Sequence, residues 1–445
     1  MIISKLKVGC SVGFFGLGKS NRALIDCLPL ESCRITLRSD NEIDESDIPK
    51  KIRVERILSG SKATTDIDED ILFFSPSVRR DGPQFLAAKE RGVVFSSDTE
   101  LFLEENDRPL FVITGSDGKS TTTHLTNMLL NEAGHKSVIL GNFGVPMWQN
   151  LGKVCDFFVC EMSSFMLTYV TPRSVASCIT TITPNHLDWH KSYEEYIETK
   201  LSVAKGTDRL IACDDNIYVK NAFGIVSLTK SFLMLKMSYS AEIYMTIEDG
   251  FICKNGKKII SRDMVLRNED HNIKNLMMAI AMTDGLIENE DIRTVATSFV
   301  GLDHRCQIIL SRDGIDFIDS SIDSTPARTV QTLMSLNRPV VIILGGRGKG
   351  LDYGEMLPSL KKYAKKVIIC GENAKEIYSQ IGNTLPSEIA DSFKNAVLLG
   401  SKYAKDTGVL LLSPASTSYD RFKNFAERGD EFKRILLEKY LNRQV

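Results

Sequence analysis

The sequence lacks several features that would place the protein in a specialised class. Its 445 residues contain no apolar run close to the roughly 20 residues that cross a bilayer, no low-complexity tract and no fixed-period repeat. The formal net charge is only −2, so there is no excess of positive charge for nucleic acid or an anionic membrane. These absences predict a globular protein without nucleic-acid or membrane partners, and we expect a monomer.

The ten cysteines form no recognisable framework. They stand singly, several lie within apolar runs, and no Cys-x-x-Cys motif occurs. This pattern is typical of free, buried thiols in a reducing compartment. Lys5 and Lys7 precede the apolar stretch 8–17 and imitate a signal peptide, but internal glycines and the lack of a cleavage site favour a buried first strand. We therefore expect a cytoplasmic protein without structural zinc.

Short apolar runs alternate with helix-like stretches along most of the chain. Unbroken runs are typical of parallel strands buried on both faces, and their alternation with helices predicts α/β layers. The strands expected from this pattern are 11–15, 71–75, 111–114, 157–160, 178–182, 340–344, 366–370 and 409–412. The runs 243–247, 250–253 and 258–260 predict a small antiparallel meander. The length predicts two or three domains, with breaks near the acidic segment 98–108 and near Gly301.

The most informative motif is a glycine-rich loop between a predicted strand and a predicted helix. It comprises Gly115, Ser116, Asp117, Gly118, Lys119 and Ser120, and Thr121 continues into the helix. Backbone N–H groups of such a loop cradle phosphate oxygens at a helix N-terminus, Lys119 would reach the terminal phosphates, and Ser120 would lie near Mg²⁺. The spacing is tighter than in the general nucleotide-binding motif, and a turn that merely contains Gly-Lys-Ser is the alternative. The loop predicts ATP binding.

A second loop follows the first predicted strand and resembles a dinucleotide fingerprint. It contains Gly16, Leu17, Gly18, Lys19, Ser20 and Asn21. Asn21 replaces the third glycine, which in that fingerprint packs the helix against the strand. The loop therefore fits a phosphorylated ligand better than a nicotinamide cofactor, and an ordinary turn between strand and helix is the alternative.

Possible metal ligands follow two other predicted strands. Glu161 ends the strand 157–160, and His186 and His190 follow the strand 178–182. Ligands of α/β sheets gather at the carboxyl ends of strands. Zinc would suit the His-x-Asp-x-His pattern, but no distant ligands confirm it, and ATP chemistry requires Mg²⁺, which prefers oxygen. The sequence favours either one metal-binding histidine near ATP or a purely structural His190.

The last third of the chain offers three more loops beside predicted strands. His304 and Arg305 flank one strand and Asp319 flanks another. The turn 345–350 combines glycines with two cations and suits a carboxylate or a phosphate. The hydroxyl-rich segment 413–420 indicates a binding loop, with helix capping as the alternative.

Taken together, six motifs resemble the Mur ligase family in order and spacing, essentially from end to end of the chain. They are 114–121, 161–165, 185–188, 271–275, 301–305 and 412–414. The turn 345–352 and the segment 418–429 are similar to the branch that adds D-glutamate. The resemblance implies an α/β protein of three domains, 1–97, 98–301 and 302–445, in which two Rossmann-like domains flank a central phosphate-loop domain. The first would bind the UDP sugar, the second ATP and the third the amino acid.

The resemblance also implies the reaction. The family joins an amino acid to a peptidoglycan precursor, and this branch adds D-glutamate to UDP-N-acetylmuramoyl-L-alanine through an acyl phosphate, with ATP and Mg²⁺. Positions that match the family's motifs carry the expected roles. The residues that bind ATP would be the loop 115–121 together with Asn275, Arg305 and Asp319. The residues that bind Mg²⁺ would be Ser120, Glu161, His186 and Lys200. Lys119, Glu161, His186 and Lys200 would form the catalytic set.

Lys200 would be the lysine that this family carbamylates, because a neutral, desolvated amine that adds CO₂ becomes a carboxylate able to bind a cation. The UDP sugar would contact Gly16, Leu17, Lys19, Ser20, Asn21, Arg38, Ser75, Asn142, Ser163 and His186. The amino acid would contact Lys349, Ser418, Tyr419 and Phe425.

The sequence departs from the family at three places. Asp117 stands where the family has asparagine, Glu269 where it has glycine, and the loop 319–326 is one residue longer and lacks the family's lysine. The last departure leaves open a subfamily variant or altered selectivity, for instance for L-glutamate. A related ligase and a non-catalytic nucleotide-binding regulator also stay open as functions, and a nicotinamide-dependent oxidoreductase is the least favoured.

Overall fold

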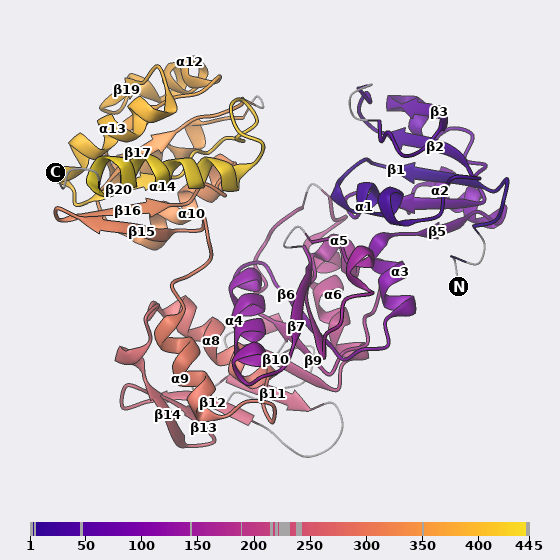
Figure 1. Cartoon of the computed structure of the whole chain (residues 1–445), viewed down its shortest axis with the longest axis horizontal. Coiled ribbons are helices and arrows are strands. Elements are labelled where there is room, and N and C mark those ends of the chain that lie inside the picture. Colours follow the sequence, from indigo (N-terminus) through magenta and orange to yellow (C-terminus); the bar gives the residue numbers. More distant parts are fainter. Residues whose placement is uncertain are drawn as a thin grey trace. The chain divides into compact units, whose positions relative to one another are not determined.

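The computed structural model describes residues 3, 6–44, 48–142, 145–187, 189–213, 217–218, 221, 232–236, 243–348 and 351–441. The chain divides into two compact units, Met1–Phe299 and Val300–Val445. The first unit contains two sheets and the second contains one, coloured from indigo to yellow along the sequence in Figure 1. The predicted α/β class is confirmed, whereas the domain boundaries at residues 97 and 301 stay predictions.

The first sheet consists of five parallel strands in the order β3-β2-β1-β4-β5. They are β1 (Ser11–Phe15), β2 (Arg34–Ser39), β3 (Val54–Ser59), β4 (Ile71–Phe74) and β5 (Val94–Ser96). The helices of this region are α1 (Lys19–Cys27), the 3-10 helix η3 (Gly60–Thr64), α2 (Pro83–Glu90) and α3 (Asp98–Glu105). Every residue of β1 is buried, because two hydrophobic clusters hold its alternating side chains. This strand order is that of a Rossmann-like sheet without its sixth strand, as the predicted Rossmann-like fold requires.

The second sheet has nine strands in the order β14-β13-β12-β11-β10-β9-β6-β8-β7. Its parallel part comprises β6 (Leu110–Thr114), β7 (Ser137–Gly141), β8 (Phe157–Glu161), β9 (Ala176–Ile179) and β10 (Arg209–Cys213). The antiparallel part comprises β11 (Phe232–Lys236), β12 (Ile243–Glu248), β13 (Phe251–Lys254) and β14 (Lys257–Ser261). The predicted meander is therefore confirmed, and it extends the parallel sheet.

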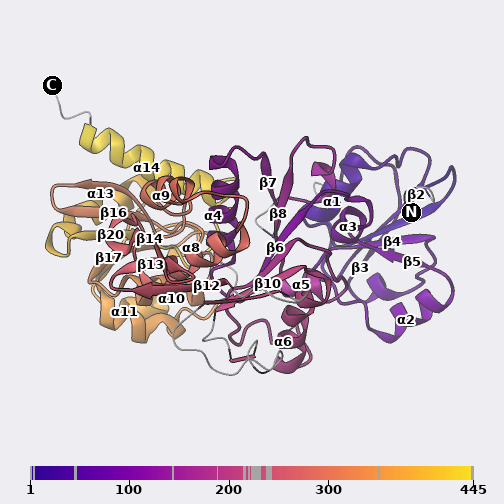
Figure 2. The same cartoon turned by 90° about the horizontal axis from the view of Figure 1, so that it is seen from below.

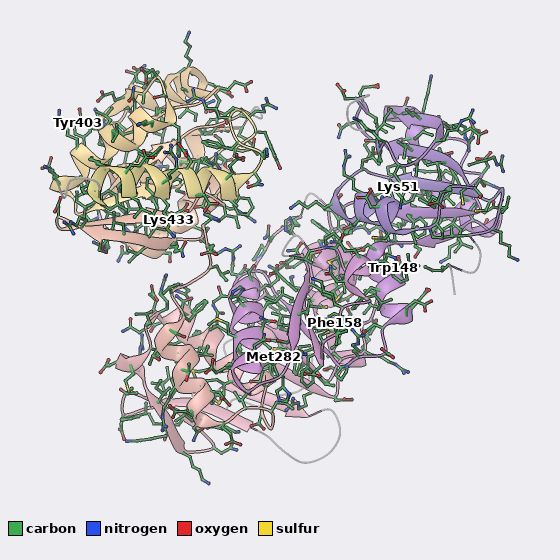
Figure 3. The ribbon with its side chains drawn as sticks, viewed as in Figure 1. Lys51, Trp148, Phe158, Met282, Tyr403 and Lys433 are labelled. Atoms are coloured by element: carbon green, nitrogen blue, oxygen red, sulfur yellow. The ribbon has the colours of Figure 1, made fainter. Side chains whose placement is uncertain are left out.

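Helices cover this sheet and position the site. They are α4 (Lys119–Glu132), the 3-10 helix η4 (Trp148–Asn150), α5 (Ser164–Leu167), α6 (Tyr193–Leu201), η5 (Ser202–Gly206), η6 (Arg262–Met264), α8 (Asp270–Met282) and α9 (Asn289–Ser298). Helix α4 lies against β6, β7 and β8 and packs on α8 and α9 (Figure 2). Residues of α5 and α6 join the core cluster that contains Phe158, the β8 residue labelled in Figure 3.

The second unit holds a six-stranded sheet in the order β15-β16-β20-β17-β18-β19, in which only the edge strand β15 is antiparallel. The strands are β15 (Gln307–Arg312), β16 (Ile315–Asp319), β17 (Val340–Leu344), β18 (Ala364–Ile369), β19 (Ser387–Ile389) and β20 (Val409–Leu412). The helices are α10 (Pro326–Leu336), η7 (Gly354–Met356), α11 (Leu357–Tyr363), α12 (Ala374–Ile377), η8 (Tyr378–Gly382), α13 (Phe393–Tyr403), η9 (Ala404–Asp406) and α14 (Phe425–Leu441). One hydrophobic cluster includes residues of α10 and α11, and another includes residues of α13 and α14.

Two expectations from the sequence need correction. The strand predicted at 178–182 is β9, which ends at Ile179, because Thr180 and Thr181 turn away to hydrogen-bond the phosphate loop. The cysteines whose burial is described form no disulfide bonds, but they are not uniformly buried, since Cys27 is exposed. Among the described residues, no helix is long and apolar enough to cross a membrane.

Candidate active site

The phosphate loop between β6 and α4 has a backbone shape that requires glycine. Gly115 has a φ of 142° and Gly118 a φ of 82°, in the region that side chains disfavour. A Cβ atom on Gly115 would lie 2.0 Å from Thr180 Oγ1, and one on Gly118 would lie 2.5 Å from Asn275 Oδ1. Both positions therefore require glycine, because of the close neighbours as well as the dihedral angles.

The segment that follows β9 holds this loop in place. The Ser116 N–H donates to the Thr181 carbonyl (2.7 Å), and the Asp117 N–H donates to Thr181 Oγ1 (2.8 Å). The Ser116 hydroxyl donates to the Thr183 carbonyl (3.0 Å), and the Thr180 hydroxyl donates to the Asp117 carbonyl. The loop is thus shaped in advance by the carboxyl end of a neighbouring strand, where ligands of α/β sheets bind.

Two lysines converge on one carbonyl of the loop. Lys119 Nζ donates to the carbonyls of Gly115 (3.0 Å) and Ser116 (2.8 Å). Lys200 Nζ donates to the same Gly115 carbonyl (2.7 Å) and lies 4.7 Å from the centre of the Tyr196 ring. Lys200 is only 2% exposed. Burial, followed by the positive charge of Lys119, lowers the pKa of Lys200 well below its ordinary value, so this amine is unusually ready to be neutral.

Glu161, at the end of β8, carries a buried oxygen without a partner. The side chain is 2% exposed. Its Oε1 accepts a hydrogen bond from Asn142 Nδ2 (2.8 Å), whereas no described residue hydrogen-bonds Oε2. Burial of a carboxylate oxygen without a hydrogen-bond donor costs free energy, and a bound cation would offset this cost. Because Mg²⁺ favours oxygen ligands, Glu161 fits the predicted metal role, and Asn142 orients it.

The remaining predicted residues of the central sheet lie around the loop. Asn275, on α8, is buried against Gly118 and accepts from the Thr122 hydroxyl (3.3 Å). Ser120 is buried and Thr121 half-buried in the first turn of α4. Ser163 caps α5 by accepting from the Met166 N–H (3.3 Å).

His186 and His190 differ in environment. His186 is exposed, has a φ of 53°, and its ring centre lies 4.8 Å from that of Phe165. His190 is buried, and its Nε2 lies 3.0 Å from Ser164 Oγ. Burial lowers the pKa of His190. In the described part of the chain no three His, Cys, Asp or Glu side chains are grouped to hold a metal ion, and Asp188 lies outside that part.

The first sheet holds the residues predicted for the UDP sugar. Gly16 has a φ of 79°, and its carbonyl accepts from Ser75 Oγ (3.0 Å). Asn21 is fully buried and donates its amide to the carbonyls of Phe15 (3.0 Å) and Gly16 (2.7 Å). The missing third glycine is therefore replaced by a side chain that fastens α1 to the turn. Leu17 and Ser20 are half-buried and Lys19 is exposed.

Arg38 lies in the core rather than on a surface. It has no exposed area, pairs with Glu69 (Nε to Oε1, 2.8 Å) and donates to the carbonyls of Ala63, Thr65 and Asp66. These contacts give Arg38 a structural role in the fold, and its contact with a nucleotide stays a prediction.

In the second unit, both carboxylate oxygens of Asp319 accept hydrogen bonds. Its Oδ2 accepts from His304 Nδ1 (2.7 Å), and its Oδ1 accepts from the Ser321 N–H (2.8 Å). The first bond raises the pKa of His304. A Cβ atom on Gly429 of α14 would lie 2.2 Å from His304 Nδ1, so this glycine lets the helix approach the pair. Arg305, next in sequence, is half-buried.

The predicted amino-acid-binding residues lie at the start of α14 and in the loop before it. Ser418 is buried, whereas Tyr419 is 57% exposed and Phe425 is 37% exposed. The carbonyl of Phe425 accepts from Ser321 Oγ (2.8 Å), which ties it to the loop that departs from the family pattern. Lys349 lies outside the described residues.

Several residues of these sites were given no individual role from the sequence. Arg428 is 2% exposed and donates to Ser321 Oγ (2.9 Å) and to the carbonyls of Ser321 (2.8 Å) and Ser416 (3.1 Å). Burial lowers its pKa to about 10. Thr180 and Thr181 could have been suspected from their position directly after a strand, whereas a buried arginine on a mostly polar helix could not.

The central fold and loop define a phosphate-loop α/β protein that can bind a nucleotide. The chain belongs to the Mur ligase family: the model of the Mur ligase middle domain matches residues 113–283, and that of the Mur ligase, glutamate ligase domain matches residues 304–416. A UDP-N-acetylmuramoylalanine–D-glutamate ligase of Acetivibrio thermocellus is 33% identical over 82% of each chain. An enzyme of the same name from Clostridium kluyveri is 31% identical over 96% of each chain.

Solved structures show the same fold at lower identity. A UDP-N-acetylmuramate-alanine ligase of Thermotoga maritima superposes with a TM-score of 0.56 and 18% identity, covering 97% of this chain and 99% of that one. A MurF ligase of Thermotoga maritima in complex with ADP gives a TM-score of 0.52 and 13% identity, covering 97% and 96%. At these identities the likeness concerns the fold alone.

Proposed function

We propose that the chain is an ATP-dependent ligase that joins D-glutamate to UDP-N-acetylmuramoyl-L-alanine in the cytoplasm, as a step of peptidoglycan precursor synthesis. Relatives of that name match it over 82% to 96% of its length. The observation that carries the chemistry is the convergence of Lys119 and Lys200 on the Gly115 carbonyl, at the edge of the sheet where β8 ends in Glu161.

The phosphate loop supplies positioning and positive charge. A carboxylate forms an amide only after one of its oxygens becomes a leaving group, so the alanyl carboxylate first attacks the γ-phosphorus of ATP and releases ADP. The amine of D-glutamate then attacks the acyl carbon, and phosphate leaves. Loop N–H groups and Lys119 hold the phosphates in line, and the fixed backbone needs no rearrangement during the reaction.

Four residues would hold the metal: Ser120, Glu161, His186 and Lys200, the last as its carbamate. Bound there, Mg²⁺ would neutralise charge on the phosphates. The unpartnered Oε2 of Glu161 and the lowered pKa of Lys200 support this assignment. Addition of CO₂ forms a C–N bond at the neutral Nζ, releases one proton and leaves a carboxylate on the side chain.

The other two regions would bring the substrates. Residues 1–97 would hold the UDP sugar on the loop that includes Gly16, Lys19 and Ser20 and on Ser75, with Asn142, Ser163 and His186 contributing from the central domain, residues 98–301. Residues 302–445 would hold the amino acid with Lys349, Ser418, Tyr419 and Phe425, and Arg305 and Asp319 would contact the adenosine side of ATP. The enzyme would act as a monomer.

ADP release tests this function. The purified chain is incubated with ATP, Mg²⁺, UDP-N-acetylmuramoyl-L-alanine and one member of a panel of amino acids that includes both enantiomers of glutamate. We expect ADP release that depends on both the UDP sugar and D-glutamate. If L-glutamate supports ADP release and D-glutamate does not, the amino acid must be reassigned. If no amino acid of the panel supports ADP release, the proposed ligase function is refuted.

A further inference from the structure

Arg79 lies five residues after β4, in the loop that begins with the predicted sugar contact Ser75, and it binds two other elements of the first unit. Its Nη1 and Nη2 donate to the carboxylate of Glu195 on α6 (2.9 and 2.8 Å). Its Nε and Nη2 donate to Asp81 (3.0 and 2.7 Å), and Nη1 also donates to the Trp189 carbonyl (3.0 Å). All five N–H groups of the guanidinium are therefore used.

Two partners of Arg79, Glu195 and Trp189, belong to segments that carry proposed catalytic residues. Glu195 lies on α6, the helix that also bears the buried Lys200. Trp189 ends the turn that begins at His186, whose carbonyl accepts from the N–H groups of Trp189 (3.1 Å) and His190 (3.0 Å). His186 has the left-handed φ of 53°, a conformation that costs free energy and persists only where its surroundings hold it. The Arg79 bond to the Trp189 carbonyl is one such restraint.

Further contacts close the same cluster. The Trp189 indole N–H donates to the Ser77 carbonyl (2.6 Å), and the Arg79 guanidinium lies 4.7 Å from the indole ring centre. Lys191 donates its backbone N–H to Glu195 (2.7 Å) and pairs through Nζ with Asp81. His190 Nδ1 lies 3.4 Å from Glu195, and its other nitrogen contacts Ser164, three residues after Glu161. The cluster thus connects the loop after β4 to both sides of the phosphate loop.

The geometry of the cluster indicates a positioning role, because Arg79 binds the carboxylates of Asp81 and Glu195 with two hydrogen bonds each. The Arg79 and Glu195 side chains are only 21% and 26% exposed, so this is not a loose ion pair on the open surface. A planar guanidinium that binds two carboxylates in pairs of bonds instead fixes distance and angle between the segments that hold them. The Arg79 guanidinium lowers the pKa of Glu195 to about 2, so both groups stay charged at neutral pH.

We infer that Arg79 is a positioning residue of the ligase: it holds the sugar-binding loop after β4, the turn of His186 and the helix of Lys200 in one arrangement. The inference rests on the proposed function. Because Arg79 acts through the groups it aligns, its loss should reduce turnover and the apparent affinity for the UDP sugar. The apparent affinity for the amino acid, which the second unit is proposed to bind, should not change.

The test compares Arg79→Gln, Arg79→Lys and Arg79→Ala in the full-length enzyme with Arg293→Gln, which breaks the exposed pair of Arg293 and Glu290 in the same unit. We expect Arg79→Gln to lower kcat about tenfold or more and to raise KM for the UDP sugar, since small misplacements of reacting groups cost this much. The KM of Arg79→Gln for D-glutamate should stay within about twofold of the wild-type value. All kinetic constants of Arg293→Gln should also stay within about twofold of the wild-type values. Arg79→Lys should fall in between, and added ethylguanidine should partly restore Arg79→Ala.

A second readout does not need turnover. The chain has two tryptophans, so Trp148→Phe leaves Trp189 as the only one, and excitation at the red edge of tryptophan absorption selects it over the tyrosines. In that background Arg79→Gln should shift the Trp189 emission, whereas Arg293→Gln should not. Unchanged emission together with wild-type kinetics in Arg79→Gln would overturn the inference, as would a uniform loss in which both KM values rise alike and ethylguanidine has no effect. If the wild type shows no ligase activity, the proposed function fails, and Trp189 emission alone decides whether Arg79 holds this turn.

Discussion

Lys119 and Lys200 donate to the same carbonyl, yet their surroundings give them opposite tasks. Lys119 belongs to the loop itself and is half-buried, so its side chain is placed to meet phosphate. Lys200 comes from α6, is buried beside Tyr196, and is repelled by Lys119. A buried amine with a lowered pKa reacts with CO₂ more readily than an exposed one, because only its neutral form is a nucleophile.

Lys200→Ala should therefore lose most ADP release, at least about a hundredfold, because a metal ligand is missing. Short carboxylic acids such as formate or acetate should partly restore it by taking the place of the carbamate. Lys205→Ala, which removes an exposed lysine five positions further on, is the control and should keep full activity. Full activity of Lys200→Ala, measured by ADP release, would refute the carbamate role.

The pair of His304 and Asp319 predicts a pH dependence of the second unit. The bond raises the folded-state pKa of His304 above its unfolded value near 6.5, so its stabilisation is fully present below that value and is lost as the pH rises through the folded pKa. His304→Gln should lower the unfolding free energy at pH 6 and have less effect at pH 9. Urea titrations of both proteins at the two pH values measure this. An equal difference at both would mean that the pair does not titrate as described.

At the scale of elements, the phosphate loop depends on its neighbours as much as on its own residues. Gly118 is enclosed by Asn275 of α8, whereas Gly134, with a φ of 86°, has open space around its Cα. Gly118→Ala and Gly134→Ala therefore carry a similar backbone cost, on the order of 1 kcal/mol, but only the first creates a collision.

We expect Gly118→Ala to bind MgADP at least about tenfold more weakly than the wild type, because the loop must shift away from Asn275. Gly134→Ala should bind with wild-type affinity and show only a small loss of stability. Isothermal titration calorimetry with both variants makes the comparison. Equal affinities would show that the loop tolerates a side chain at position 118 and that its shape is not decisive.

Elements with a strong local pattern could be predicted from the sequence. The strands β1, β17 and β20 have the predicted bounds, because unbroken apolar runs mark fully buried strands. The phosphate loop could be predicted because its glycines and lysine occur together. Strand β3 alternates exposed and half-buried residues and includes Arg56, so its pattern is too weak to be recognised. The threonines that shape the loop and the burial of Arg38 depend on contacts between distant segments, which no local pattern records.

At the scale of the whole molecule, the described residues form three sheets in two compact units. Each unit has its own hydrophobic clusters, so the units should unfold in separable steps. Scanning calorimetry should resolve more than one transition, and His304→Gln should move only the transition of the second unit. A single transition with equal calorimetric and van't Hoff enthalpies would contradict this independence.

The central claim is that the chain forms an amide between UDP-N-acetylmuramoyl-L-alanine and D-glutamate. Mass spectrometry of the product tests it most directly. The wild-type enzyme with ATP, Mg²⁺ and isotopically labelled D-glutamate should yield a UDP sugar heavier by one labelled glutamate residue, and Lys200→Ala should yield little. Labelled L-glutamate should give no such product. A ligated product from L-glutamate alone, or unchanged UDP sugar with both enantiomers, would contradict the account.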